Sequence, residues 1–135
     1  MLAIDNLTTE IDSDGGLVRA VDALALTIER GETFALVGES GCGKSMTALS
    51  ILRLLPDAGR VAAGSVDVDG TDILQLPEMR MRDFRGHRIS IIFQEPSTSL
   101  NPVMTVGRQI AEVIERHTVL RGDAAQVKAI EWLTR

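Results

Sequence analysis

Apolar and polar residues alternate along the first part of the chain, and this alternation predicts β-strands. The alternating stretches are residues 2–7, 24–28 and 64–70. A period of two places one side of each strand against a core. Two further stretches, 33–37 and 89–93, are short continuous apolar runs, which are typical of strands buried on both faces. We therefore expect an exposed, strand-rich N-terminal portion and two buried strands.

Apolar residues at helical spacing predict four helices between and after these strands. The helical segments are residues 45–55, 77–84, 105–117 and 123–133. Pro56 is expected to stop the first helix, because proline cannot continue one. Thr105 and Asp123 are short polar residues at the starts of the last two, so we expect each to cap its helix. Strands followed by helices in this way indicate an α/β fold.

Composition and charge narrow the class of protein. The 135 residues suit one domain or part of one, and 44% of them are apolar, enough for a core. A net charge of −5 disfavours binding to the phosphate backbone of nucleic acid. Cys42 is the only cysteine, which excludes an internal disulfide. Without a signal peptide or a long apolar run, we expect a cytoplasmic chain that is at most peripheral to a membrane.

A glycine-rich segment between the strand at 33–37 and the first helix carries the most specific chemistry. Gly38-Glu-Ser-Gly-Cys-Gly-Lys-Ser45 fits the pattern G-x-x-x-x-G-K-[ST] at every position. Glycines let consecutive backbone N–H groups converge on an anion, and the helix N-terminus adds partial positive charge. The predicted phosphate-binding residues are Gly38, Glu39, Ser40, Gly41, Cys42, Gly43, Lys44, Ser45 and Met46.

Two residues of this loop have specific expected roles. Lys44 is placed to reach the β- and γ-phosphates of a nucleotide, and the Ser45 hydroxyl is placed to ligate Mg²⁺. The expected cofactors are therefore ATP and Mg²⁺. The alternative is a glycine-rich turn that only joins a strand to a helix, and Lys44, one of two lysines in the chain, weighs against it.

A second motif follows the apolar run at 89–93. It reads Gln94-Glu-Pro-Ser-Thr-Ser-Leu-Asn-Pro-Val-Met-Thr105, a polar residue at the end of a strand and then a loop bounded by prolines. Gln94 in that place is a candidate for orienting a water or contacting the metal. By spacing alone, a glutamine in that place is more often an ordinary loop amide.

The two motifs together resemble the ATP-binding subunits of ABC importers, and within them the oligopeptide, dipeptide and glutathione group. The resemblance covers essentially all 135 residues. It implies a P-loop NTPase fold of the ABC type, with an antiparallel β portion, the start of a RecA-like core and the opening of a helical subdomain. It also implies that Gln94 is the Q-loop glutamine, which contacts Mg²⁺ or the attacking water.

The same resemblance implies partners and a location. Transmembrane permease subunits and a second ATP-binding subunit would assemble with this one at the cytoplasmic face of the membrane, where ATP hydrolysis energises uptake of peptides or a similar small solute. No nucleic-acid partner is expected.

The chain departs from the family pattern in two respects. The Leu-Ser-Gly-Gly signature, the Walker B acids and the switch histidine do not occur in it, so residues 1–135 resemble a partial ATP-binding domain that alone is not expected to hydrolyse ATP. The family usually has an aromatic that stacks on adenine about twenty residues before the P-loop, and this segment, around Val18, has none. That loss weakens binding by roughly 1–3 kcal/mol and blunts any preference for adenine.

Two alternative functions remain at the level of sequence. A small-molecule P-loop kinase shares the phosphate-binding loop, but the strands that precede Gly38 argue against it. A non-catalytic remnant that binds nucleotide or nothing is the other alternative.

Overall fold

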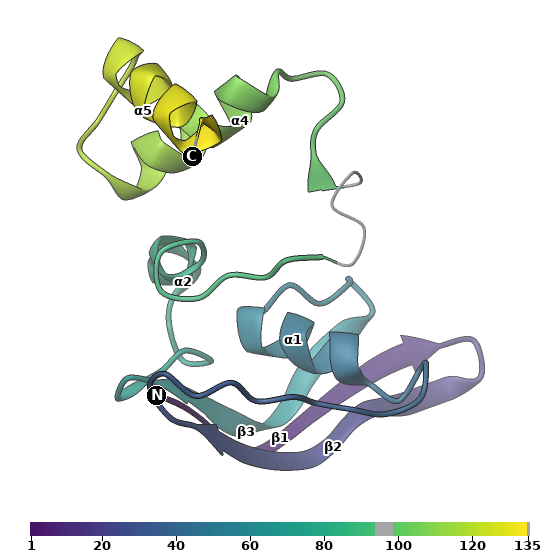
Figure 1. Ribbon diagram of the computed structural model, residues 1–135. Coiled ribbons are helices and arrows are strands. Elements are labelled where there is room, and N and C mark those ends of the chain that lie inside the picture. The colour runs from purple at the N-terminus through teal and green to yellow at the C-terminus, as the bar shows by residue number, and fades with distance from the viewer. Residues whose placement is uncertain (94–98, 135) are drawn as a thin grey trace. The chain divides into compact units, whose positions relative to one another are not determined.

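The computed structural model describes residues 1–93 and 99–134. The chain divides into two compact units, Met1–Pro77 and Glu78–Arg135. The first unit holds a sheet and one helix, and the second holds three described helices (Figure 1).

An antiparallel sheet forms most of the first unit. Its strands are β1 (Leu2–Ser13), β2 (Gly16–Ile28), β3 (Gly59–Val68) and β4 (Thr71–Asp72). They lie in the order β2-β1-β3-β4, and every neighbouring pair is antiparallel. The predicted strands are confirmed here, and β1 and β2 are longer than the alternation indicated. Ser13 pairs with Gly16, so β1 and β2 form a hairpin that is closed by two residues.

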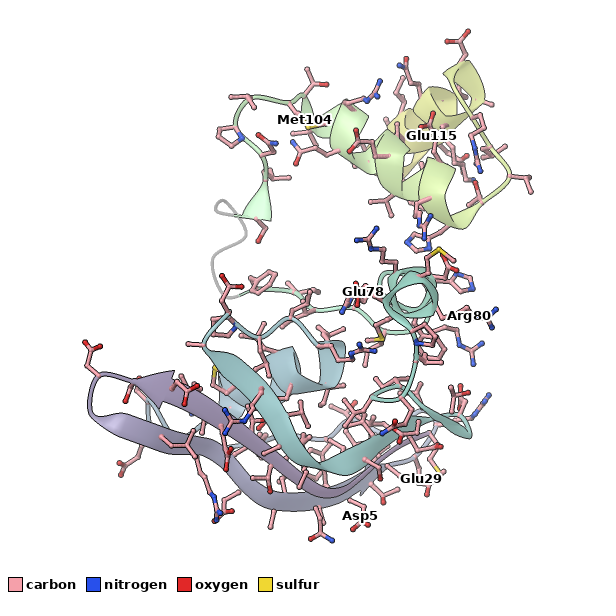
Figure 2. All side chains as sticks on the ribbon, turned by 180° about the vertical axis from the view of Figure 1, so that it is seen from behind. Asp5, Glu29, Glu78, Arg80, Met104 and Glu115 are labelled. Carbon is pink, nitrogen blue, oxygen red and sulfur yellow. The ribbon has the colours of Figure 1, made fainter. Side chains whose placement is uncertain are left out.

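Helix α1 (Lys44–Leu52) packs on one face of this sheet. The core beneath it is apolar and consists of Ile4, Leu7, Val21, Leu52, Val66, Val68 and Ile73. Asp5 lies on the opposite face, which points away from α1 (Figure 2). Alternate residues of a strand face opposite sides, so the alternation in the sequence correctly divided core from solvent.

A buried pair of hydroxyls joins α1 to β1. Thr9 and Ser50 are fully buried, and their oxygens lie 2.7 Å apart. The Ser50 hydroxyl donates its single proton to the carbonyl of Met46, at 2.6 Å. Ser50 therefore accepts, and Thr9 donates. Each of these polar groups has a partner in the core.

The second unit contains α2 (Glu78–Phe84), α4 (Val106–His117) and α5 (Asp123–Leu133). Helices α4 and α5 pack together around Ala111, Ile114, Ala125 and Ala129. Thr105 caps α4 as predicted, since its side chain accepts from the N–H of Arg108 at 3.3 Å. Among the described residues, no helix has the length and apolar character needed to cross a bilayer.

The predicted cap at Asp123 is wrong by one residue. Gly122 occupies the cap position, and Asp123 is the first residue of α5. The Glu115 carboxylate accepts from the N–H of Gly122 at 2.9 Å and so fixes the chain where it enters the helix. The Asp123 carboxylate then lies in the first turn, where it complements the helix dipole.

The two strands predicted at 33–37 and 89–93 are not found. Neither segment forms a ladder, and Val37 and Ile92 are 86% and 92% exposed. A strand buried on both faces needs neighbouring strands, and the residues that the structure describes supply none. Helix α1 also ends at Leu52 rather than at 55, because Arg53 adopts a left-handed conformation with a φ of 53°.

Candidate functional site

The glycine-rich loop leads directly into α1 (Figure 1). Gly43 is the residue that caps the helix, and no side chain bonds to the N–H groups of its first turn. Those N–H groups belong to Lys44, Ser45 and Met46. The first turn also carries no acidic side chain. The start of α1 therefore offers partial positive charge and donor groups to an anion.

The Lys44 ammonium lies inside the loop. Its Nζ donates to the carbonyls of Gly38, at 2.7 Å, and Glu39, at 2.6 Å. It also lies 3.4 Å from the sulfur of Cys42. Carbonyl oxygens hold the cation without neutralising it, because they carry no net charge. The loop consequently encloses a positive charge that remains available to a negatively charged group.

Gly43 joins the loop to the sheet. A Cβ at this position would lie 2.3 Å from the carbonyl oxygen of Ala20 in β2, which is closer than any real Cβ contact. The φ of Gly43 is 90°, in the left-handed region that L side chains rarely adopt. The backbone of the loop thus contacts the backbone of β2, and this contact requires glycine.

A cavity of about 240 Å³ lies beside this contact. It is lined by Ala20, Val21, Asp22, Leu24, Leu36, Val37, Cys42, Lys44 and Thr47. Thr47 also fixes the start of α1, since both its N–H (2.8 Å) and its hydroxyl (3.1 Å) donate to the carbonyl of Gly43. The cavity brings β2, the loop and the first turns of α1 to one place.

The structure collects the predicted loop residues, Gly38 through Met46, at this single site. Cys42 and Ser45 are exposed there. Gln94 lies outside the described residues, so its contact with metal or water stays a prediction. Sequence reasoning missed the part played by Ala20 and by the Thr9–Ser50 pair, because alternation marks a position as core or surface but does not say which backbone groups touch.

Val18, near which the sequence lacks an aromatic residue, lies in β2 two residues before Ala20. Its partner across the hairpin is Ile11 of β1. The side chain of Val18 is exposed, and Ile11 is half-buried. Two aliphatic residues therefore occupy this part of the hairpin.

Curated relatives match the whole length of this chain. A peptide import ATP-binding protein of Brucella abortus (strain 2308) is 46% identical over 135 residues, which are 100% of this chain and 41% of that protein. The dipeptide transport ATP-binding protein DppD of Bacillus subtilis (strain 168) is 42% identical, with 99% of this chain and 40% of that protein covered. The chain thus spans about two fifths of these relatives.

The fold also matches a solved structure. The ATP-binding cassette MJ0796, in a dimeric state bound to ADP and Pi, aligns with a TM-score of 0.82 over 99% of this chain and 56% of that one, at 24% identity. A family model described as ABC transporter matches residues 21–135. The loop and the helix that follows it lie within the matched residues, and the chain belongs to the ABC transporter family.

Proposed function

We propose that this chain binds MgATP through the loop Gly38–Ser45, as part of the ATP-binding subunit of an ABC importer. The observation that carries the proposal is the Lys44 ammonium, held in the loop by two uncharged carbonyls beside the uncapped N-terminus of α1. Charge-assisted hydrogen bonds contribute about 1.5–3 kcal/mol each. A few of them supply the roughly 8 kcal/mol that micromolar affinity requires.

Two residues would hold the magnesium ion. The hydroxyl of Ser45, in the exposed first turn of α1, is the first, and Gln94 is the second, by its resemblance to the Q-loop residue. Bound magnesium neutralises charge on the phosphate oxygens. The chain's own contribution is to place donor groups and one ammonium around those oxygens.

The remaining proposals concern the whole protein. The relatives' names mention import of peptides and transport of dipeptides, so we propose that the solute is a peptide or a similar small molecule. We further propose permease subunits and a second ATP-binding subunit as partners, at the cytoplasmic face of the membrane. The kinase alternative receives no support from the family match. We propose that this chain alone binds ATP without hydrolysing it.

A calorimetric titration with MgATP tests the proposal. We expect saturable binding that falls at least tenfold in Lys44→Ala, because the ammonium is the loop's only full positive charge. The matched control is Lys128→Ala, since Lys128 is the other lysine of the chain and pairs with Glu131 in α5, at 2.8 Å.

The outcomes of this titration separate the alternatives. If Lys44→Ala binds as tightly as the unaltered chain, the assigned site is wrong. If neither chain binds MgATP while both give the circular dichroism spectrum of a folded protein, the non-catalytic remnant is the better description.

A further inference from the structure

The short helix α2 and the turn after it carry a charge opposite to that of the rest of the chain. Residues 78–88 include four arginines and two acidic residues, a net charge of +2, whereas the whole chain carries −5. All the other residues together therefore carry −7. Exposed charges more than about 8 Å apart are largely screened at physiological ionic strength. A ligand that contacts this segment therefore meets mainly its positive charge.

The two acidic residues of the segment are already engaged in ion pairs. The Glu78 carboxylate lies 2.6 Å from the guanidinium of Arg85 and 3.6 Å from that of Arg82. The Asp83 carboxylate lies 2.5 Å from the guanidinium of Arg116, which belongs to α4. Arg116 thus adds a fifth arginine to the four of the segment, and the number of nearby carboxylates remains two.

Arg80 keeps its positive charge available to a ligand. Its side chain is exposed, and it makes no ion pair within the part of the chain that the structure describes. Glu78 and Arg80 lie on nearly opposite sides of α2, which Figure 2 shows end-on, because successive residues of a helix are about 100° apart. Arg82 is 66% exposed even though it contacts Glu78.

An exposed methionine lies between these arginines. Met79 is 77% exposed, whereas Met81 is fully buried and anchors the other side of the helix. Helical spacing places Arg80 on one flank of Met79 and Arg82 on the other. We call the surface formed by Met79, Arg80, Arg82 and Arg116 the arginine face.

We propose that the arginine face docks on a bilayer that contains anionic lipids. Guanidinium groups bind phosphate oxygens through paired hydrogen bonds. The flexible apolar side chain of Met79 enters the boundary between headgroups and acyl chains. Basic residues beside an exposed apolar one favour a lipid surface over nucleic acid, which offers methionine no apolar layer. The inference goes beyond the proposed function and depends on it only for the location of the chain at a membrane.

The strength of this contact follows from the charge of the face. Each basic residue close to an anionic bilayer strengthens binding about fivefold. Three arginines and the one carboxylate of Asp83 give a net charge of +2, and so a preference of about 25-fold for anionic over neutral lipid. Binding of this strength is reversible, unlike that of a chain with a lipid anchor and a basic patch together.

Cosedimentation with vesicles tests the proposal on the chain without nucleotide. One set of vesicles is pure phosphatidylcholine, and the other is an equimolar mixture of phosphatidylcholine and phosphatidylglycerol. We expect the chain to bind the mixed vesicles about 25-fold more tightly. Salt at about 1 M should remove the difference, because it shortens the Debye length to about 3 Å.

Paired variants locate the contact. Arg80→Gln combined with Arg82→Gln should weaken binding to the mixed vesicles about 5- to 25-fold. The matched control, Arg19→Gln with Arg108→Gln, removes the same charge from arginines that are 61% and 62% exposed and lie outside the arginine face, so it should change binding less than about twofold. Met79→Gln keeps the charge and should weaken binding about 3- to 10-fold.

The other outcomes overturn the proposal in distinct ways. If the chain binds both kinds of vesicle equally, or if the two double variants lose equal affinity, the arginine face does not bind lipid. If a DNA duplex binds the chain as tightly as the mixed vesicles do, and Met79→Gln changes neither, the face recognises polyanions in general. MgATP titration of the same variants should show unchanged affinity. Loss of lipid binding with MgATP binding retained would overturn this inference alone, and the reverse result would overturn only the proposed function of the loop.

Discussion

The two units of the chain build their interiors from different side chains. In the first unit, residues such as Leu7, Val66 and Ile73 are fully buried between the sheet and α1. In the second unit, three of the four residues in the core between α4 and α5 are alanines, and Ile114 is the only large one. Burial of a large apolar side chain contributes about 1.5–3 kcal/mol, whereas an alanine contributes far less.

We infer from this difference that the first unit is more rigid than the α4–α5 hairpin of the second unit. The described residues of the proposed site belong to the first unit, where the loop contacts β2 and α1 is bonded to β1. The α4–α5 hairpin buries little and exposes Val127, Ile130 and Leu133 on α5. Regions with few buried apolar contacts open first. We therefore expect the hairpin to unfold more readily than the sheet.

Removal of one large core residue from each unit gives the largest expected effects. Leu7→Ala should lower the free energy of unfolding of the first unit by about 2–5 kcal/mol and weaken MgATP binding, because the loop rests on the sheet through its contact with β2. Ile114→Ala, with about 2 kcal/mol lost, should loosen only the hairpin and leave binding intact. Trp132, the only tryptophan, lies in α5, so urea unfolding followed by its fluorescence reports on the second unit.

Hydrogen exchange of the β1 amides reports on the first unit in the same samples. Loss of protection in β1 caused by Ile114→Ala would contradict the separation of the units. An unchanged binding constant in Leu7→Ala would contradict the link between the sheet and the site.

Loss of the hydroxyl pair between β1 and α1 is expected to lower the unfolding free energy by an intermediate amount. Ser50→Ala leaves the buried Thr9 hydroxyl without its partner, which should cost about 1–3 kcal/mol of unfolding free energy. Adding Thr9→Val to Ser50→Ala should recover part of that loss, because the unpaired hydroxyl is then gone. A double-mutant cycle by urea unfolding measures the coupling, and a coupling near zero would show that the pair does not join the two elements.

The smallest expected effect on stability comes from an ion-pair cluster at Asp69, on the surface of the first unit. The amino group of Met1 and then the guanidinium of Arg30, each 2.8 Å from its carboxylate, hold the pKa of Asp69 below its ordinary value. A lowered pKa stabilises the folded state above the pKa of the unfolded chain, about 3.9, and the stabilisation is lost as pH falls through the folded pKa.

Asp69→Asn should therefore flatten the decline of the melting temperature below about pH 4, without changing the Trp132 signal of the second unit. Melting curves recorded from pH 6 to pH 3 would measure this. An equally steep decline in Asp69→Asn would mean that other carboxylates carry the acid sensitivity.

Local patterns predicted most of the fold, and the two predicted strands that are not found share one cause. The alternating strands of the sheet, α1, α2, α4 and the Thr105 cap depend on neighbours within a few residues, which the sequence displays directly. The segments at 33–37 and 89–93 depend on partner strands distant in the chain. Their apolar character indicates burial, but a local pattern does not say which strands would pair with them.

In the candidate site too, local features were predicted from the sequence and long-range contacts were not. The loop motif predicted which residues gather at the start of α1, because the motif is local. The contact of Gly43 with Ala20 and the position of Ile11 opposite Val18 come from the register of the hairpin. Register follows from strand pairing over many residues, which no single residue reveals.

Two glycines of the loop differ in how much variation they would tolerate. Gly41 has a φ of 85° with open space around it, whereas Gly43 has a φ of 90° and the Ala20 carbonyl against it. Asparagine or aspartate can adopt such a backbone angle, so a library of all substitutions should retain a few binders altered at residue 41. At residue 43 it should retain none. The same residue type in the loop is thus a preference at position 41 and a strict requirement at position 43.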